Sequence, residues 1–273
     1  MKSNGTKIII YVLLTAISLV MIFPFAWMIL TSLKTQAESI AVPPKLLPAA
    51  PQWVNYLNVW RQIPLLRYFM NTIIVTVLTL AGVIITSTMA AFAFSFKEFK
   101  GRDLSFMALL AMMMIPQPVY LVPAYVILAK LHWLDTFYAM IVPWVVNILS
   151  IFLMRQHFKT IPLSLYEASK MDGAGDLQFI WHILLPVSKP VIITISLFSV
   201  IGSWNSFLWP LIVTNSEKMR PLQVGLSYFS QEQGSLWPQL MSASTMVIMP
   251  LIVFYIFAQK QITESFVSSG IKE

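Results

Sequence analysis

The stretch "YFMNTIIVTVLTLAGVIITSTMAAFAFSF", residues 68–96, contains no Asp, Glu, Lys, Arg or His. Roughly 20 mostly apolar residues are enough for a helix to cross the hydrocarbon of a bilayer, so this run can span a membrane. We therefore expect an all-α polytopic membrane protein with six transmembrane helices in a single transmembrane domain, residues 1–273. The other apolar runs predict spans at about 8–30, 104–129, 136–154, 187–213 and 240–259.

The composition agrees with a bilayer as the main solvent. Hydrophobic residues make up 58% of the 273 and charged residues 11%, and the mean hydropathy is +0.75, far outside soluble usage. The first apolar run is longer than that of a secretion signal, so we expect it to be retained. The net charge of +7 needs no nucleic-acid partner, because anionic lipid attracts basic residues near the membrane.

The distribution of Lys and Arg predicts the orientation. If the N-terminus is cytoplasmic, 11 of the 18 basic residues fall on the cytoplasmic side. Both termini are then inside, the loops 31–67 and 213–239 are outside, and the segment between spans 4 and 5 is cytoplasmic.

Several kinds of chemistry have no residues to support them. No Asp, Glu, Lys, Arg or His lies inside the apolar runs, if the charge-free part of the fifth is taken as 190–215, and this disfavours proton or sodium coupling. The chain lacks the Gly-x-x-x-x-Gly-Lys-Ser/Thr loop that cradles nucleotide phosphates. Cys is absent and the three His lack metal-ligand spacing. We predict no catalytic residue, no metal and no cofactor on this chain, so any energy must come from outside it.

Residues 161–186, "IPLSLYEASKMDGAGDLQFIWHILLP", concentrate charge between two apolar runs. Pro162 suits a helix start and Gly173 a helix end, so the pattern predicts a short amphipathic helix. From the pattern alone, a helix lying on the inner membrane face is an equal alternative.

The spacing in this segment is more specific. Glu-Ala-Ser, three residues, Gly173, nine residues, then Ile-Leu-Leu-Pro resembles the EAA signature of ATP-binding-cassette importer permeases. Ser169 stands where the signature usually has alanine. The resemblance implies a coupling helix that docks on a cytoplasmic ATPase. The ATPase-coupling residues that it implies are Glu167, Ala168, Ser169, Asp172, Gly173, Leu185 and Pro186.

Other stretches are similar to the carbohydrate-uptake, maltose-type (MalG-like) branch of that family: "PFAWMILTSLKTQAE", "YFMNTIIVT", "SWNSFLWPLIV", "MRPLQVGL" and "FVSSGIK". The resemblance implies a multi-pass subunit of a bacterial or archaeal cell membrane. Its implied partners are a second permease subunit, two ATPase subunits that bind ATP and Mg, an extracellular sugar-binding protein and a carbohydrate substrate. A self-sufficient channel or facilitator, or an intramembrane enzyme, stays open as an alternative.

Amides and aromatic rings in the spans suggest a route for the solute. We predict a substrate pathway at Trp204 and Asn205 of the fifth span and Asn147 of the fourth, because an aromatic face and an amide suit an uncharged polyhydroxylated ligand. Asn205 alternatively bonds to the sister subunit, since an amide in hydrocarbon needs a partner. Trp209 is expected in the interfacial aromatic belt. The prolines of the third and sixth spans suggest broken helices.

The outer loop 213–239 is longer than a plain turn requires. Its polar tip comprises Ser230, Gln231, Glu232, Gln233 and Gly234. In the maltose-type family the corresponding loop enters the cleft of the docked binding protein, so the resemblance implies a binding-protein contact here. A loop packed on the sister subunit is the alternative.

Overall fold

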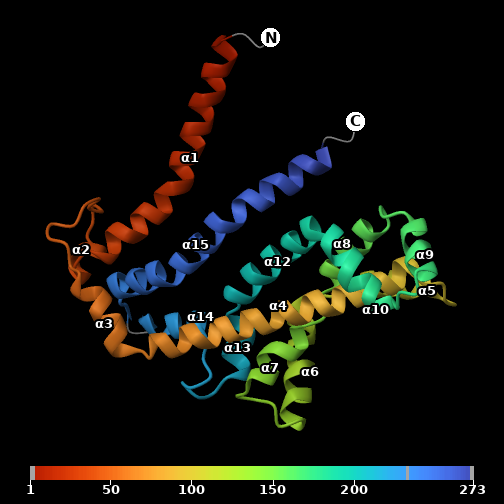
Figure 1. The fold of residues 1–273 in the computed structure, drawn as a ribbon. Coiled ribbons are helices and arrows are strands. Elements are labelled where there is room, and N and C mark those ends of the chain that lie inside the picture. Colours follow the sequence, from red (N-terminus) through yellow and green to blue (C-terminus); the bar gives the residue numbers. More distant parts are fainter. Residues whose placement is uncertain (1–3, 232–233, 271–273) are drawn as a thin grey trace. The chain divides into compact units, whose positions relative to one another are not determined.

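The computed structural model describes residues 4–231 and 234–270. The described chain is helical apart from one two-residue antiparallel ladder that pairs Ser230 with Ser235 (Figure 1). The elements are α1 (Asn4–Ser32), α2 (Gln36–Ser39), α3 (Val54–Gln62), α4 (Leu65–Phe96), α5 (Arg102–Ala111), η1 (Met112–Met114), α6 (Gln117–Lys130), α7 (Phe137–Ile141), η2 (Val142–Trp144), α8 (Ile148–Phe158), α9 (Leu163–Met171), α10 (Asp176–Phe179), η3 (Ile180–Leu184), α11 (Leu185–Val187), α12 (Lys189–Trp204), α13 (Leu208–Val213), α14 (Leu222–Leu226), η4 (Ser227–Phe229), β1 (Ser230–Gln231), β2 (Gly234–Ser235) and α15 (Trp237–Gly270).

The described helices confirm an all-α chain that can cross a membrane. Four are long and apolar enough to span: Lys7–Ser32, Leu65–Phe96, Phe137–Phe158 and Trp237–Ile256. Two further pairs of helices pass the same test together but are sharply bent, which allows up to six spans. The expected six therefore holds if each bent pair is one span, and the orientation of the termini stays a prediction.

Proline accounts for the first bend. The axes of Arg102–Met114 and Gln117–Lys130 meet at 101°. Ile115 precedes Pro116 and is extended, at φ −83° and ψ 114°, because the proline ring disfavours a helical conformation in the residue before it. Pro250, in contrast, lies inside the continuous helix α15, so the prolines break the third predicted span but not the sixth.

The second bend, of 84°, separates Asp176–Val187 from Lys189–Trp204. Ser188 lies at the bend with φ −93° and ψ 12°. Pro190 follows in the first turn of α12, where its missing N–H group costs no hydrogen bond. The residues of the fifth predicted span, 187–213, contain α12 and α13 with an irregular break between them, whereas the bent pair joins α12 to residues 176–187.

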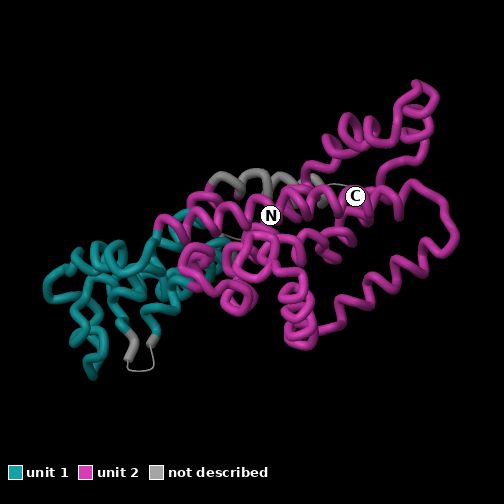
Figure 2. Tube along the Cα trace, turned by 90° about the horizontal axis from the view of Figure 1, so that it is seen from below, with its two compact units in different colours: residues 1–65, 225–252 teal, residues 66–224, 253–273 magenta. Residues whose placement is uncertain are grey.

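The chain divides into two compact units, coloured separately in Figure 2: residues 1–65 with 225–252, and residues 66–224 with 253–273. In the first unit, Lys34 is buried and its Nζ donates to the carbonyl of Lys45 over 2.6 Å. The same ammonium group lies 4.3 Å from the centre of the Trp27 ring. Asn55 donates to the carbonyls of Ser32 and Lys34, so the segment after α1 is fixed by side-chain bonds.

In the second unit, α4 lies close to the irregular segment between η2 and α8. A Cβ on Gly82 would come 2.5 Å from Cγ1 of Val145, so only glycine allows this approach. Thr86 donates to the carbonyl of Val145 over 2.6 Å, which satisfies a backbone group that the break leaves free. This contact places the irregular segment beside the middle of α4.

Candidate functional site

The helix α9 of the segment 161–186 ends in a glycine cap. Gly173 has φ +80°, its N–H donates to the carbonyl of Lys170, and the N–H of Ala174 donates to the carbonyl of Ser169. This is a Schellman motif, which favours glycine because a side chain strains the left-handed conformation. A Cβ at Gly173 would meet nothing within 4 Å, so the backbone angle and not the space explains the glycine.

The third position of the matched signature is buried. Ser169 is 4% exposed and its Oγ donates to the carbonyl of Tyr166 over 2.7 Å. A small side chain is required there because the helix packs on the rest of the unit at this point. Leu185 is half-buried against the hydrophobic core of the second unit. The remaining predicted coupling residues, Glu167, Ala168, Asp172, Gly173 and Pro186, are exposed.

The segment also exposes large apolar side chains. A solvated helix would not need them, and an exposed apolar patch marks a surface that contacts lipid or another protein. They are Leu163, Leu165, Met171, Leu177 and Trp181, of which Met171 is 83% exposed.

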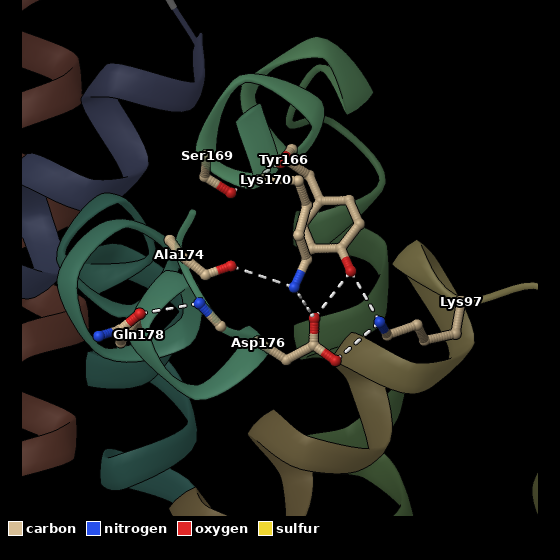
Figure 3. Close-up of polar contacts among 8 residues, drawn as sticks. Lys97, Tyr166, Ser169, Lys170, Ala174, Asp176 and Gln178 are labelled. Atoms are coloured by element: carbon tan, nitrogen blue, oxygen red, sulfur yellow. Dashed lines mark hydrogen bonds and ion pairs between the residues drawn. The ribbon is translucent and has the colours of Figure 1, made fainter. Parts of the chain in front are cut away.

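A cluster of charges holds this segment to the end of α4 (Figure 3). The carboxylate of Asp176 accepts from Nζ of Lys97 and from Nζ of Lys170, each over 2.7 Å, and from the hydroxyl of Tyr166 over 2.8 Å. Lys97 also donates to the Tyr166 hydroxyl over 2.7 Å. The hydrogen bond to Asp176 raises the pKa of Lys97 above its ordinary value of 10.5. Sequence reasoning missed this cluster, because Lys97 and Asp176 are far apart in the chain.

Aromatic rings pack around Tyr166, which belongs to this cluster. The Tyr166 ring centre lies 5.0 Å from that of Phe179, 5.5 Å from Phe96 and 5.8 Å from Phe92. These phenylalanines belong to the buried core of the second unit. The segment 161–186 therefore packs on the core that also contains the end of α4.

A cavity of about 500 Å³ opens in the second unit, between α4, η2 and the break from α12 to α13. Its volume lies in the range of small-molecule sites, about 300–1,000 Å³. None of the lining residues is charged. The polar ones are Thr72, Thr79, Gln117, Asn147, Ser199, Ser203, Asn205 and Ser206, and the aromatic ones are Trp144, Phe198, Phe207 and Trp209.

Two of the three predicted pathway residues line this cavity. Asn147 caps α8, because its Oδ1 accepts from the N–H and the hydroxyl of Ser150. Asn205 donates to the carbonyl of Ile201 and accepts from Gln223 over 3.4 Å. Trp204 is not a lining residue; it is 6% exposed and its ring meets Phe69 edge to face at 5.8 Å.

Trp209 was expected in the interfacial aromatic belt, but the structure buries it. It is 3% exposed, and its Nε1 donates to the carbonyl of Ala139 over 2.9 Å. Its ring lies edge to face against Trp144 at 5.8 Å, and both rings line the cavity. Burial is tolerated because the indole N–H has found a backbone acceptor.

The strap, residues 214–222, borders the cavity through Pro221 and is held by side chains from other elements. Asp135 accepts from the N–H groups of Asn215 and Ser216, each over 2.9 Å. Asn71 donates to the carbonyls of Lys218 and Arg220, and Thr72 accepts from the N–H of Leu222.

The charge of Asp135 is stabilised by these bonds. Partial burial raises the pKa of its carboxyl group, but the N–H groups of Ser216 and Asn215 outweigh burial and hold the pKa below the ordinary value of 3.8. The strap therefore stabilises the ionised form of Asp135.

The predicted binding-protein contact is described only in part. Ser230 is exposed, and Ser230 and Gln231 pair with Gly234 and Ser235. Glu232 and Gln233 lie outside the described residues. Within the described ranges no group of three His, Cys, Asp or Glu is placed to hold a metal ion.

An uncharged cavity in a chain with several helices long and apolar enough to cross a bilayer fits a multi-pass membrane permease. The chain belongs to the family of binding-protein-dependent transport system inner membrane components, whose model matches residues 82–266. An ABC transporter permease protein, ORF2, from Caldicellulosiruptor sp. (strain Rt8B.4) is 34% identical over 98% of this chain and 98% of the relative.

Two further comparisons agree with that family. The arabinooligosaccharides transport system permease protein AraQ of Bacillus subtilis (strain 168) is 29% identical over 94% of this chain and 92% of AraQ. A chain from the crystal structure of a bacterial ABC transporter involved in the import of the acidic polysaccharide alginate matches with a TM-score of 0.83. That chain is 26% identical, and the match covers 95% of this chain and 98% of the other.

Proposed function

We propose that this chain forms half of the translocation pathway of an ATP-driven importer for a sugar or oligosaccharide. The observation that carries the proposal is the cavity, whose wall combines hydroxyl and amide groups with four aromatic rings and no charge. Sugars offer hydroxyl groups for hydrogen bonds and C–H faces for aromatic contact, so this wall suits them. The named cargoes of AraQ and of the alginate importer are likewise carbohydrates.

The energy for import comes from separate subunits in this proposal. Two cytoplasmic ATPase subunits bind ATP and Mg, and this chain has no catalytic role. The coupling segment docks on the ATPase through α9, with Glu167, Ala168, Asp172 and Gly173 on its exposed side. The exposed Met171 and Leu165 support this docking, because a partner would bury them.

A second permease subunit and an extracellular sugar-binding protein complete the assembly. The second permease would close the pathway beside the cavity. The binding protein would deliver the sugar at the outer face, where the tip of the loop 213–239 meets it. This arrangement requires the termini and the coupling segment to be cytoplasmic, as the Lys and Arg distribution predicts.

Purification and reconstitution test the proposal. The tagged chain should co-purify with a second permease and an ATPase, and proteoliposomes should take up sugar only with ATP inside and the binding protein outside. Uptake by this chain alone, without ATP, would identify a channel or facilitator instead. Turnover of a substrate without transport would identify an enzyme.

A further inference from the structure

We infer that the cavity is a subsite for an electrically neutral sugar unit, so that this chain's half of the pathway disfavours acidic sugars. The inference rests on the proposed function, in which the cavity is part of the pathway, and adds the class of cargo.

The wall offers hydrogen bonds to hydroxyl groups. Asn147 uses its Oδ1 to cap α8, and no hydrogen bond among the described residues occupies its amide nitrogen. Thr79 is 5% exposed and its hydroxyl has no partner in the described part of the chain. A buried hydroxyl without a partner is unfavourable, but this oxygen has less than 1 Å² of its surface exposed, so a solute or a water molecule reaches it only if the wall shifts.

The residues of α4 that line the cavity form one face of the helix. Thr72, Val75, Thr79 and Val83 recur at helical spacing, so hydroxyl groups alternate with apolar side chains along the wall. A sugar ring has the same alternation of hydroxyl groups and C–H faces. Trp144 also lines the cavity, and its ring offers an apolar surface to the C–H face of a sugar.

No lining residue can neutralise an anion. A carboxylate or phosphate that leaves water for this wall loses its hydration without gaining a cation, whereas a hydroxyl needs only one or two neutral hydrogen bonds. The amides and hydroxyls of the wall can form hydrogen bonds with a hydroxyl group, but they cannot neutralise a carboxylate or a phosphate. The wall therefore discriminates by charge and not only by size.

Charged groups lie outside the wall, at the strap and beside it. Arg220 precedes the lining residue Pro221 but is not itself a lining residue, and its buried Nε has no hydrogen-bond partner in the described part of the chain. Asp135 is bonded to the N–H groups of the strap. Acidic and basic groups thus both occur at the strap, and neither sign dominates there.

Cysteine labelling in the assembled importer measures this preference directly, because the chain contains no cysteine. Gly202→Cys places a thiol on the wall without a clash, since a Cβ there meets nothing within 4 Å. Ser203→Cys is a near-isosteric second position on the same wall. Val42→Cys, at a residue that is 93% exposed in the outer loop, is the matched control.

Each variant reacts in nanodiscs with neutral hydroxyethyl methanethiosulfonate and with anionic sulfonatoethyl methanethiosulfonate, and mass spectrometry follows the label on this chain. Relative to the control, we expect the anionic reagent to label Gly202→Cys about tenfold more slowly than the neutral one, because it finds no cation in the wall. Asn205→Lys should restore most of that loss by placing a cation at the C-terminal end of α12.

Sugar protection provides the second measurement. Glucose and glucuronate share a ring and differ in one carboxylate, so they form a matched pair. Glucose should slow the neutral labelling of Gly202→Cys at least about twofold more than glucuronate at equal concentration, because only glucuronate has a charge to desolvate.

The outcomes separate the inference from the proposed function. Equal normalised rates for the two reagents, or equal protection by the two sugars, would overturn the neutral subsite and leave the pathway standing. A third outcome is that neither reagent labels Gly202→Cys or Ser203→Cys, with or without ATP, while Val42→Cys reacts. The cavity is then not on the pathway, and both the neutral subsite and the proposed function of the cavity are wrong.

Discussion

Replacement of Gly173 by alanine isolates the role of the cap at the end of the coupling helix. Gly173 has φ +80°, and an added Cβ would meet nothing within 4 Å. The left-handed conformation costs a residue with a Cβ about 1–2 kcal/mol. Gly173→Ala therefore penalises the capped conformation without introducing a clash inside the chain.

The expected loss of ATPase affinity can be calculated if the ATPase binds only the capped conformation of α9. A penalty of about 1–2 kcal/mol then weakens the affinity of the ATPase for the permease by up to about 5–30-fold, the full loss being reached where the capped and uncapped conformations of the free permease are close in free energy. Titration of the ATPase onto the permease pair in nanodiscs measures this affinity. Sugar uptake per ATP hydrolysed should fall with it, because fewer complexes are docked.

Gly175→Ala is the matched control in the same segment. Gly175 has φ −71°, and a Cβ there would lie 3.7 Å from Oε1 of Gln178, an ordinary contact. We expect the affinity of the ATPase for the Gly175→Ala permease to stay within about twofold of its affinity for the unsubstituted permease. Gly173→Asn should lie between the two alanine variants, because asparagine tolerates the left-handed conformation better. Equal affinities for Gly173→Ala and Gly175→Ala would refute the reasoning.

Four further changes test the other sites. Asn205→Leu should reduce sugar uptake while the subunits still co-purify, and loss of the complex would place this residue at the subunit interface instead. Asp176→Asn should weaken ATPase docking by at most about 30-fold, because its two ion pairs are partly exposed and such pairs contribute only about 0.2–1 kcal/mol each. Lys97→Met removes one of the two pairs and should have a similar or smaller effect, and a larger loss than for Asp176→Asn would contradict the cluster's geometry. Deletion of residues 231–234 should slow uptake that depends on the binding protein and leave basal ATPase activity intact, and unchanged uptake would make the loop a simple connector.

Local features of the chain were predictable because they depend on local chemistry. A run without charge needs lipid or protein around it wherever it lies, so the membrane-spanning character of α1 and α4 follows from composition. Gly173 was predicted as a helix end, and it has the left-handed angle that the cap requires. The spacing from Glu167 to Pro186 led to the family that the comparison establishes.

Features that join distant parts of the chain were not predictable in the same way. Lys97 meets Asp176 only because the end of α4 packs beside the coupling segment. Trp209 lies near the end of a predicted span, where a belt was the reasonable expectation, but the carbonyl of Ala139 accepts its indole N–H and allows burial. The bend at Pro116 was suggested by the prolines, and its angle was not.

The sequence by itself thus determined the solvent of this protein and the glycine cap of α9, the predicted coupling helix, since each depends on residues close together in the chain. Only the tertiary structure decided that Asn147 and Asn205 share one uncharged cavity while Trp204 lies outside its wall. The physical reason is that a cavity is the space left between helices, and its lining depends on which faces pack together.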